Sequence, residues 1–222
     1  MKKLRFCFCF IIVFTMLFCA CKTPNPLHSL VSELRSDVYS GSGETISLTA
    51  CYGFNETPLK SDGKVGERVY ALQFKLKDKS IDLVSYSLSF DFNNQTYKSD
   101  FKQNPITHTL TAVIEVNGFN KKEFEVSVNY GSINEVITLT SKVPENTLTY
   151  SQALDCLYSE QRALIDSYQN TNGDLELEIC ARVIVKNERP YWYIGLRGSN
   201  GALKALLIDG FTGDTLAIRE IF

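Results

Sequence analysis

The chain has few of the residues that enzymes use for acid–base or nucleophilic chemistry. Only two histidines, His28 and His108, occur among its 222 residues, and neither belongs to an HExxH zinc motif. The sequence also lacks the G-x-S-x-G, Walker and G-x-G-x-x-G motifs of hydrolases, NTPases and dinucleotide-binding enzymes. We therefore assign no catalytic residue, metal ligand or cofactor, and an exported enzyme is only the third of our functional hypotheses.

Cysteine is sparse outside the N-terminus, since four of the seven cysteines precede residue 22. The other three, Cys51, Cys156 and Cys180, form no C-x-x-C pair, which excludes a thioredoxin-like motif and a zinc knuckle. Helical spacing places Cys156 away from an apolar stripe, and Cys180 shares its strand face with the charged residues Glu178 and Arg182, opposite the core face. We expect the two to lie on opposite sides of a sheet and to remain free thiols.

The chain also lacks an excess of positive charge. Three of its 23 basic residues and none of its 25 acidic residues lie in positions 1–21, so residues 22–222 carry a net charge of −5. This balance gives no sign of a nucleic-acid partner. The hydrophobic content of 44% is enough for a globular core.

The first 21 residues have the layout of a secretory signal peptide. Three positive residues precede an apolar run over residues 6–20, which is too short for a comfortable membrane span. The run ends in Phe18-Cys19-Ala20-Cys21, which resembles a bacterial lipobox, although Phe18 departs from that motif. We predict a lipoprotein signal peptide over 1–21 with lipidation at Cys21, and a short tether over 22–37. An ordinary cleaved signal peptide and a retained anchor are the alternatives.

Residues 38–143 have the period-2 alternation of half-buried strands. In the segment 82–92, for example, Tyr86, Leu88 and Phe90 point one way and the intervening serines the other. Six or seven such segments separated by turns predict an immunoglobulin-like β-sandwich. The polar loop 53–67 is either a binding loop or a solvated linker, and the fold by itself selects no function.

The pattern changes after residue 148. Leu154, Leu157 and Leu164 follow helical spacing, and four apolar strand segments come next, separated by turns at 187–188, 200–201 and 209–214. This order predicts one helix packed on a four-stranded antiparallel sheet. The predicted fold class is therefore all-β plus α+β, with the sandwich domain at 38–143 and the α+β domain at 148–222.

The C-terminal segment contains a short motif of a known family. An aromatic pair at Tyr191-Trp192, an aliphatic strand ending at Asp209 and a turn at Thr212-Gly213 resemble the C-terminal half of a PepSY-like domain. Gly210 departs from the Ala that is frequent there. The resemblance covers about residues 148–222 and implies a non-catalytic domain that restrains a protease or binds another protein. The carboxylates of this turn, and those of the segment 170–176, are attributed to turn chemistry, with calcium as the alternative.

Alternation on the aromatic strand separates two sets of residues. Trp192 is expected in the core, and Tyr191, Tyr193 and Arg197 lie on the opposite face, where they are the candidate protein-binding residues. The first functional hypothesis is a membrane-anchored lipoprotein, at the bacterial cell surface or on the periplasmic face, that binds a protein or a protease through this domain. The second is a structural or adhesion lipoprotein whose sandwich does the binding.

Overall fold

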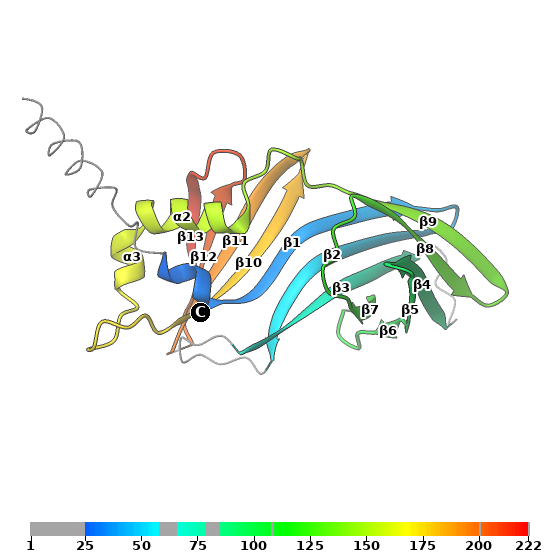
Figure 1. The fold of residues 1–222 in the computed structure, drawn as a ribbon, viewed down its shortest axis with the longest axis horizontal. Coiled ribbons are helices and arrows are strands. Elements are labelled where there is room, and N and C mark those ends of the chain that lie inside the picture. The colour runs from blue at the N-terminus through cyan, green and yellow to red at the C-terminus, as the bar shows by residue number, and fades with distance from the viewer. Residues whose placement is uncertain (1–24, 58–65, 79–84, 108, 200, 222) are drawn as a thin grey trace, which may run out of the picture.

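The computed structural model describes residues 25–57, 66–78, 85–107, 109–199 and 201–221. Most of these residues form strands, and two α-helices and a short 3₁₀-helix cover one end of the sheet (Figure 1). The elements in chain order are η1 (Pro26–Leu30), β1 (Val31–Ser42), β2 (Ile46–Thr57), β3 (Glu67–Asp78), β4 (Tyr86–Phe92), β5 (Gln95–Asp100), β6 (Lys102–Gln103), β7 (Leu110–Glu115), β8 (Glu123–Tyr130), β9 (Ile133–Ser141), α2 (Tyr150–Glu160), α3 (Arg162–Asp166), β10 (Leu177–Lys186), β11 (Arg189–Gly198), β12 (Leu203–Asp209) and β13 (Thr215–Ile221).

All thirteen described strands belong to one hydrogen-bonded sheet. The first part of β1 pairs in parallel with β10, and its last part pairs antiparallel with β9. The predicted fold class, a sandwich followed by a separate helix on a four-stranded sheet, is therefore wrong. The reason is the length of β1, β2 and β3, which have 12 residues each and extend under both halves of the molecule.

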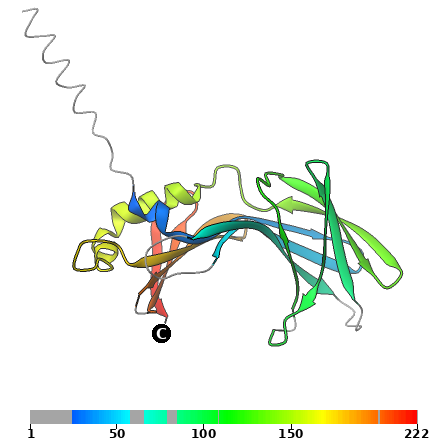
Figure 2. The ribbon, with the colours of Figure 1, turned by 60° about the horizontal axis from the view of Figure 1, so that its bottom comes forward.

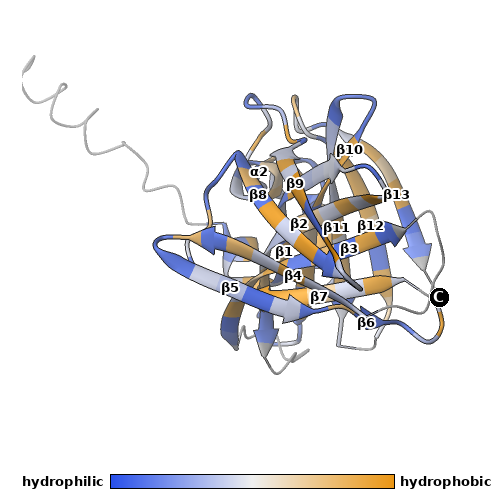
Figure 3. Cartoon of the chain, turned by 90° about the vertical axis from the view of Figure 1, so that its right-hand side faces the viewer, coloured by the Kyte–Doolittle hydropathy of each residue, from blue (hydrophilic) through white to orange (hydrophobic). Residues whose placement is uncertain are grey.

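The strands β1–β9 form a nearly closed antiparallel sheet. Its order runs β5-β4-β8-β9-β1-β2-β3-β7-β6. Only Phe101 separates β5 from β6 in the chain, and its N–H donates to the carbonyl of Tyr86 at 2.9 Å. Viewed from this end, apolar and polar segments alternate along the strands (Figure 3). The enclosed core includes Tyr39, Phe74 and Leu139, all fully buried.

The helices α2, α3 and η1 lie on one side of the sheet at its other end (Figure 2). Thr149 caps α2 by accepting from the N–H of Gln152, whose side chain in turn accepts from the N–H of Thr149. The buried face of α2, including Leu154 and Leu157, packs on the apolar face of β10–β12. Among the residues that the structure describes, no helix is long and apolar enough to cross a membrane.

The two cores lie on the same face of the central strands. No bulge interrupts the pairing of β2 with β3, so alternate residues of β2 share one face throughout. Leu48 and Ala50 belong to the first core, whereas Phe54, on the same face, belongs to the helix-covered core. The opposite face of β10–β12, which carries no described helix, is called the helix-free face below.

The segment predicted as a tether is folded from Asn25 onward. It forms η1 and the first part of β1, and its residues Leu27, Leu30 and Leu34 are buried in the helix-covered core. Residues 22–24 lie outside the described residues. The N-terminal part of the chain therefore completes the core that α2 and β10–β12 build, and Asn25 contacts α2 across 129 residues of sequence.

Candidate functional site

Strand β11 places the predicted binding residues on the helix-free face. Trp192 and Ile194 point to the helices and are buried, and the Trp192 Nε1–H donates to the carbonyl of Leu148 at 2.8 Å. Tyr191, Tyr193 and Arg197 alternate with them and are half-buried on the other face. The structure thus brings these three side chains onto one strand face, and Trp192 lies in the core as predicted.

The neighbouring strands surround these residues with both apolar and charged groups. Tyr193 lies opposite Arg182 of β10 and Leu207 of β12. Arg197 lies opposite Glu178, and the two are an ion pair at 3.8 Å. Opposite Tyr191, the side chain of Ile184 is 43% exposed. The face therefore combines aromatic, aliphatic and guanidinium groups, the composition found at the centre of protein interfaces.

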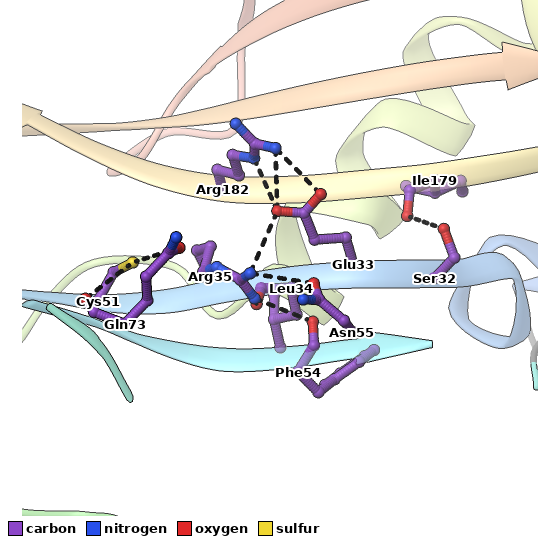
Figure 4. A network of polar contacts seen from close by, with 10 residues as sticks. All are labelled: Ser32, Glu33, Leu34, Arg35, Cys51, Phe54, Asn55, Gln73, Ile179 and Arg182. Carbon is purple, nitrogen blue, oxygen red and sulfur yellow. Dashed lines mark hydrogen bonds and ion pairs between the residues drawn. The ribbon is translucent and has the colours of Figure 1, made fainter. Parts of the chain in front are cut away.

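A charged cluster continues this face from β10 onto β1. Arg182 donates to both carboxylate oxygens of Glu33, at 3.1 and 3.0 Å, and Arg35 lies 3.6 Å from the same carboxylate (Figure 4). The side chains of Glu33 and Arg35 are only 18% and 15% exposed, whereas that of Arg182 is 52% exposed. The hydrogen bond to Glu33 raises the pKa of Arg182, which keeps the guanidinium charged.

Backbone contacts hold Arg35 in place within this cluster. Its Nη1 donates to the carbonyls of Leu34 and Phe54 at 2.9 and 3.1 Å, and its Nη2 donates to the Asn55 side chain at 3.0 Å. Both terminal nitrogens of the guanidinium are thereby engaged. A group fixed in this way contributes to a preorganised surface.

Two thiols lie on this side of the sheet and do not form a nucleophilic site. Cys180 is between Glu178 and Arg182 on β10, and Cys51 on β2 lies within 3.8 Å of the Gln73 carbonyl. Burial raises the pKa of both thiols, and the charge of Glu33 adds to this effect at Cys180. Both are therefore neutral and poorly reactive at neutral pH. Cys51, Cys156 and Cys180 are all free.

The carboxylate of the acidic turn after β12 stabilises the turn itself. Asp209 is 1% exposed and accepts from the N–H groups of Phe211 and Thr212 at 2.9 and 3.2 Å and from Arg189 Nε at 3.1 Å. Burial alone would raise the pKa of Asp209, but these hydrogen bonds outweigh it and lower the pKa. With both oxygens engaged, Asp209 orders the turn.

The side chains of the segment after α3 likewise form hydrogen bonds within that segment. The Asn170 side chain accepts from the N–H groups of Asn172 and Asp174 at 2.9 and 3.0 Å and donates to Glu176 at 3.0 Å. A pocket of about 500 Å³ lies between this segment and η1, lined in part by Pro26 and Asp166. No group of three or more metal-ligating side chains occurs within the described ranges.

His28 takes no part in this face. His28 lies on η1, where its Nε2 is 3.0 Å from the Asp155 carboxylate and 3.2 Å from the carbonyl of Ser151. His108 lies outside the described residues.

Sequence reasoning missed Glu33 and Arg35, which it had placed in the tether. Pairing shifts between Val31 and Glu33, and again between Arg35 and Asp37. These irregularities break the period-2 alternation by which a strand is read from sequence. The remaining signal was the cluster of aliphatic residues at Leu27, Leu30, Val31 and Leu34, which is unusual for a solvated tether.

Neither family models, curated proteins nor solved structures gave a match to this chain.

Proposed function

We propose that the protein is a non-enzymatic, exported lipoprotein that is anchored to a membrane through Cys21. The support is the order of charged, apolar and small residues in positions 1–21, which ends at that cysteine. Two or more acyl chains on Cys21 would give stable anchoring. Mass spectrometry of the N-terminal peptide from the membrane fraction tests this step, and an unmodified N-terminus at another residue would contradict it.

The second part of the proposal is that the helix-free face binds a protein. The observation that carries it is the position of Tyr191, Tyr193 and Arg197 on one strand face, beside the exposed Ile184 and the cluster of Glu33 with two arginines. Aromatic and Arg side chains next to apolar surface contribute most of the binding energy at protein interfaces. Because the C-terminal segment resembles a PepSY-like domain, a protease is one class of partner that we propose.

Site-specific photocrosslinking tests this binding face. A photoreactive amino acid is placed at Tyr193 in one chain and at Thr138, an exposed residue of β9, in the control chain, and both are irradiated in the producing cells. We expect a crosslinked protein at position 193 that is absent at 138. The variants Tyr191→Ala and Arg197→Ala should weaken its capture by the purified protein. Crosslinks at neither position, or at 138 alone, would contradict the proposal.

A second candidate is binding by the β1–β9 half, as in a structural or adhesion protein. The observation in its favour is the exposure of Ile133 and Val136 on β9, at 51% and 55%. The double variant Ile133→Ala/Val136→Ala would then abolish capture, while Tyr193→Ala would leave it unchanged.

A further inference from the structure

The described part of the chain begins very close in sequence to the proposed lipid attachment site. The Asn25 side chain donates to the carbonyl of Leu154 and to the carboxylate of Asp155, both at 3.0 Å. Its own oxygen accepts from the N–H of Leu27, whose side chain is fully buried. His28 adds a contact of 3.0 Å to Asp155. Residue 25 is therefore fixed to the middle of α2.

Covalent geometry then limits the distance between the lipid and the fold. Only residues 22–24 separate Cys21 from Asn25, and four residue steps of an extended chain reach at most about 14 Å. The headgroup region on each side of a bilayer is about 5–8 Å thick, so a link of this length extends less than about 10 Å beyond it. A lipidated Cys21 sits at the headgroups, so η1 cannot leave the immediate surface of the membrane.

The neighbours of η1 define which surface stays close to the bilayer. Pro26 and Ser29 of η1, Asp166 of α3 and Asp174 after it line the same pocket, which places these segments side by side. The β8–β9 hairpin lies at the opposite end of the long axis of the molecule (Figure 1).

Electrostatic attraction does not explain such an orientation. Among the described residues around η1, Asp155 and Asp174 are exposed carboxylates, and Arg162 of α3 is paired with Asp166. An acidic surface of this kind is not drawn to anionic lipid. The short covalent link has to supply the proximity.

We propose that the surface formed by η1, α3 and the segment 170–174 faces the headgroups of a lipid bilayer, and that the long axis of the molecule projects outward to the β8–β9 hairpin. This surface therefore contacts the membrane into which the acyl chains of Cys21 insert. The inference rests on the proposed lipidation of Cys21. Beyond the anchor itself, the inference states that only residues 22–24 lie between the lipid and the described fold. It also states that the β1–β9 sheet is the part of the molecule most distant from the membrane.

Fluorescence quenching from the bilayer surface tests this orientation. The full-length protein is produced in bacterial membranes, and either Ala163 of α3 or Ser132 of the β8–β9 turn, both exposed, is replaced by an azide-bearing amino acid that receives a dye. This labelling leaves the three thiols untouched. Each protein is reconstituted into phosphatidylcholine vesicles with and without spin-labelled headgroups, and Cys21 of the same sample is checked by mass spectrometry.

We expect loss of fluorescence at position 163 and none at 132. Inserting about 20 Gly/Ser residues after Lys22 adds a root-mean-square reach of about 25 Å and should abolish the loss at 163. Equal quenching at both positions, or quenching that the insertion does not change, would overturn the orientation while a lipidated Cys21 upholds the anchor. A Cys21 without lipid would overturn both.

Discussion

Arg182 on β10 holds the carboxylate of Glu33 on β1 through two hydrogen bonds, at 3.1 and 3.0 Å, across 149 residues of sequence. The two residues lie on adjacent parallel strands, where the register places Arg182 beside Arg35 and Cys180 beside Glu33. This contact joins a residue that was expected in the tether to a strand of the predicted α+β domain. It ties the N-terminal strand to the C-terminal half on the helix-free face.

A double-mutant cycle of Glu33→Ala and Arg182→Ala measures this contact. The geometry is bidentate, but the Arg182 side chain is 52% exposed, so we expect a coupling free energy of about 1 kcal/mol after solvent screening. Urea unfolding of the four proteins gives the value. The exposed pair Arg162 and Asp166, at 2.9 Å on α3, is the matched control and should couple more weakly, because both charges are screened by solvent. Coupling no larger than in this pair would contradict the prediction.

The substitution Leu27→Ala tests whether the N-terminal segment is part of the core. Leu27 is fully buried among residues of the C-terminal half, so removing its side chain should lower the free energy of unfolding by about 2–5 kcal/mol. Ser29→Ala, at an exposed position of the same short helix, should change it by less than about 0.5 kcal/mol. Equal, small effects would show that residues 25–30 act as a solvated tether.

Asp209 should contribute stability that depends on pH. Its pKa is lower in the folded protein than the usual value, so its contribution is fully present above about pH 4, the ordinary Asp pKa, and is lost as the pH falls through the lower folded value. Asp209→Asn should cost about 1–3 kcal/mol at neutral pH and flatten the acid limb of the stability curve.

The matched control for Asp209 is Asp214→Asn. Asp214 is exposed, and its carboxylate accepts from the Thr212 hydroxyl at 2.7 Å. The expected change in unfolding free energy at neutral pH is under about 0.5 kcal/mol. An acid limb equally steep in the wild type and in Asp209→Asn would show that Asp209 is not responsible for the pH dependence.

Alanine substitutions at two glycines distinguish the cost of backbone strain from the cost of side-chain crowding. Gly213 has φ +85°, and a Cβ there would collide with the Cys156 side chain, whereas Gly118 has φ +67° and open space around it. We expect Gly118→Ala to cost about 1–2 kcal/mol from strain alone. Gly213→Ala should cost about 2–4 kcal/mol, because overpacking is added.

The crowding component at Gly213 is measured by combination with Cys156→Ala, which shortens the colliding side chain. Thermal unfolding of Gly213→Ala in both backgrounds should show partial recovery. A loss at Gly213 no larger than at Gly118 would argue against the contact with Cys156.

The elements were predictable where one strand face meets a core and the other meets solvent. Tyr86, Leu88 and Phe90 of β4 are all buried, as the alternation predicted. The turn at Asn93-Asn94 has φ values of 49° and 60°, which Asn tolerates better than most residues. Strand faces and tight turns depend on neighbouring residues in the chain, so they can be predicted from a short segment of sequence.

The joining of the two halves was not predictable in the same way. Val31 of β1 pairs with Ile179 of β10. The residue pattern within one strand does not indicate which distant strand it pairs with. Within the candidate site, period 2 assigned Tyr191, Tyr193 and Arg197 correctly to one face, because β11 is regular. It could not supply Glu33 and Arg35, which lie on the irregular part of β1 and approach β10 only in the folded chain.

The long first strand has a consequence for the order in which the chain folds. Residues 31–35 are synthesised about 150 residues before the β10 residues with which they pair, an interval of roughly 10–30 s at typical rates of synthesis. During that interval the β10 edge of β1 has no partner, and Leu27 and Leu30 have no helix to cover them. Contacts of such long range form slowly. The helix-covered core therefore closes only after almost the whole chain has been made, whereas the β1–β9 core can form from residues already synthesised.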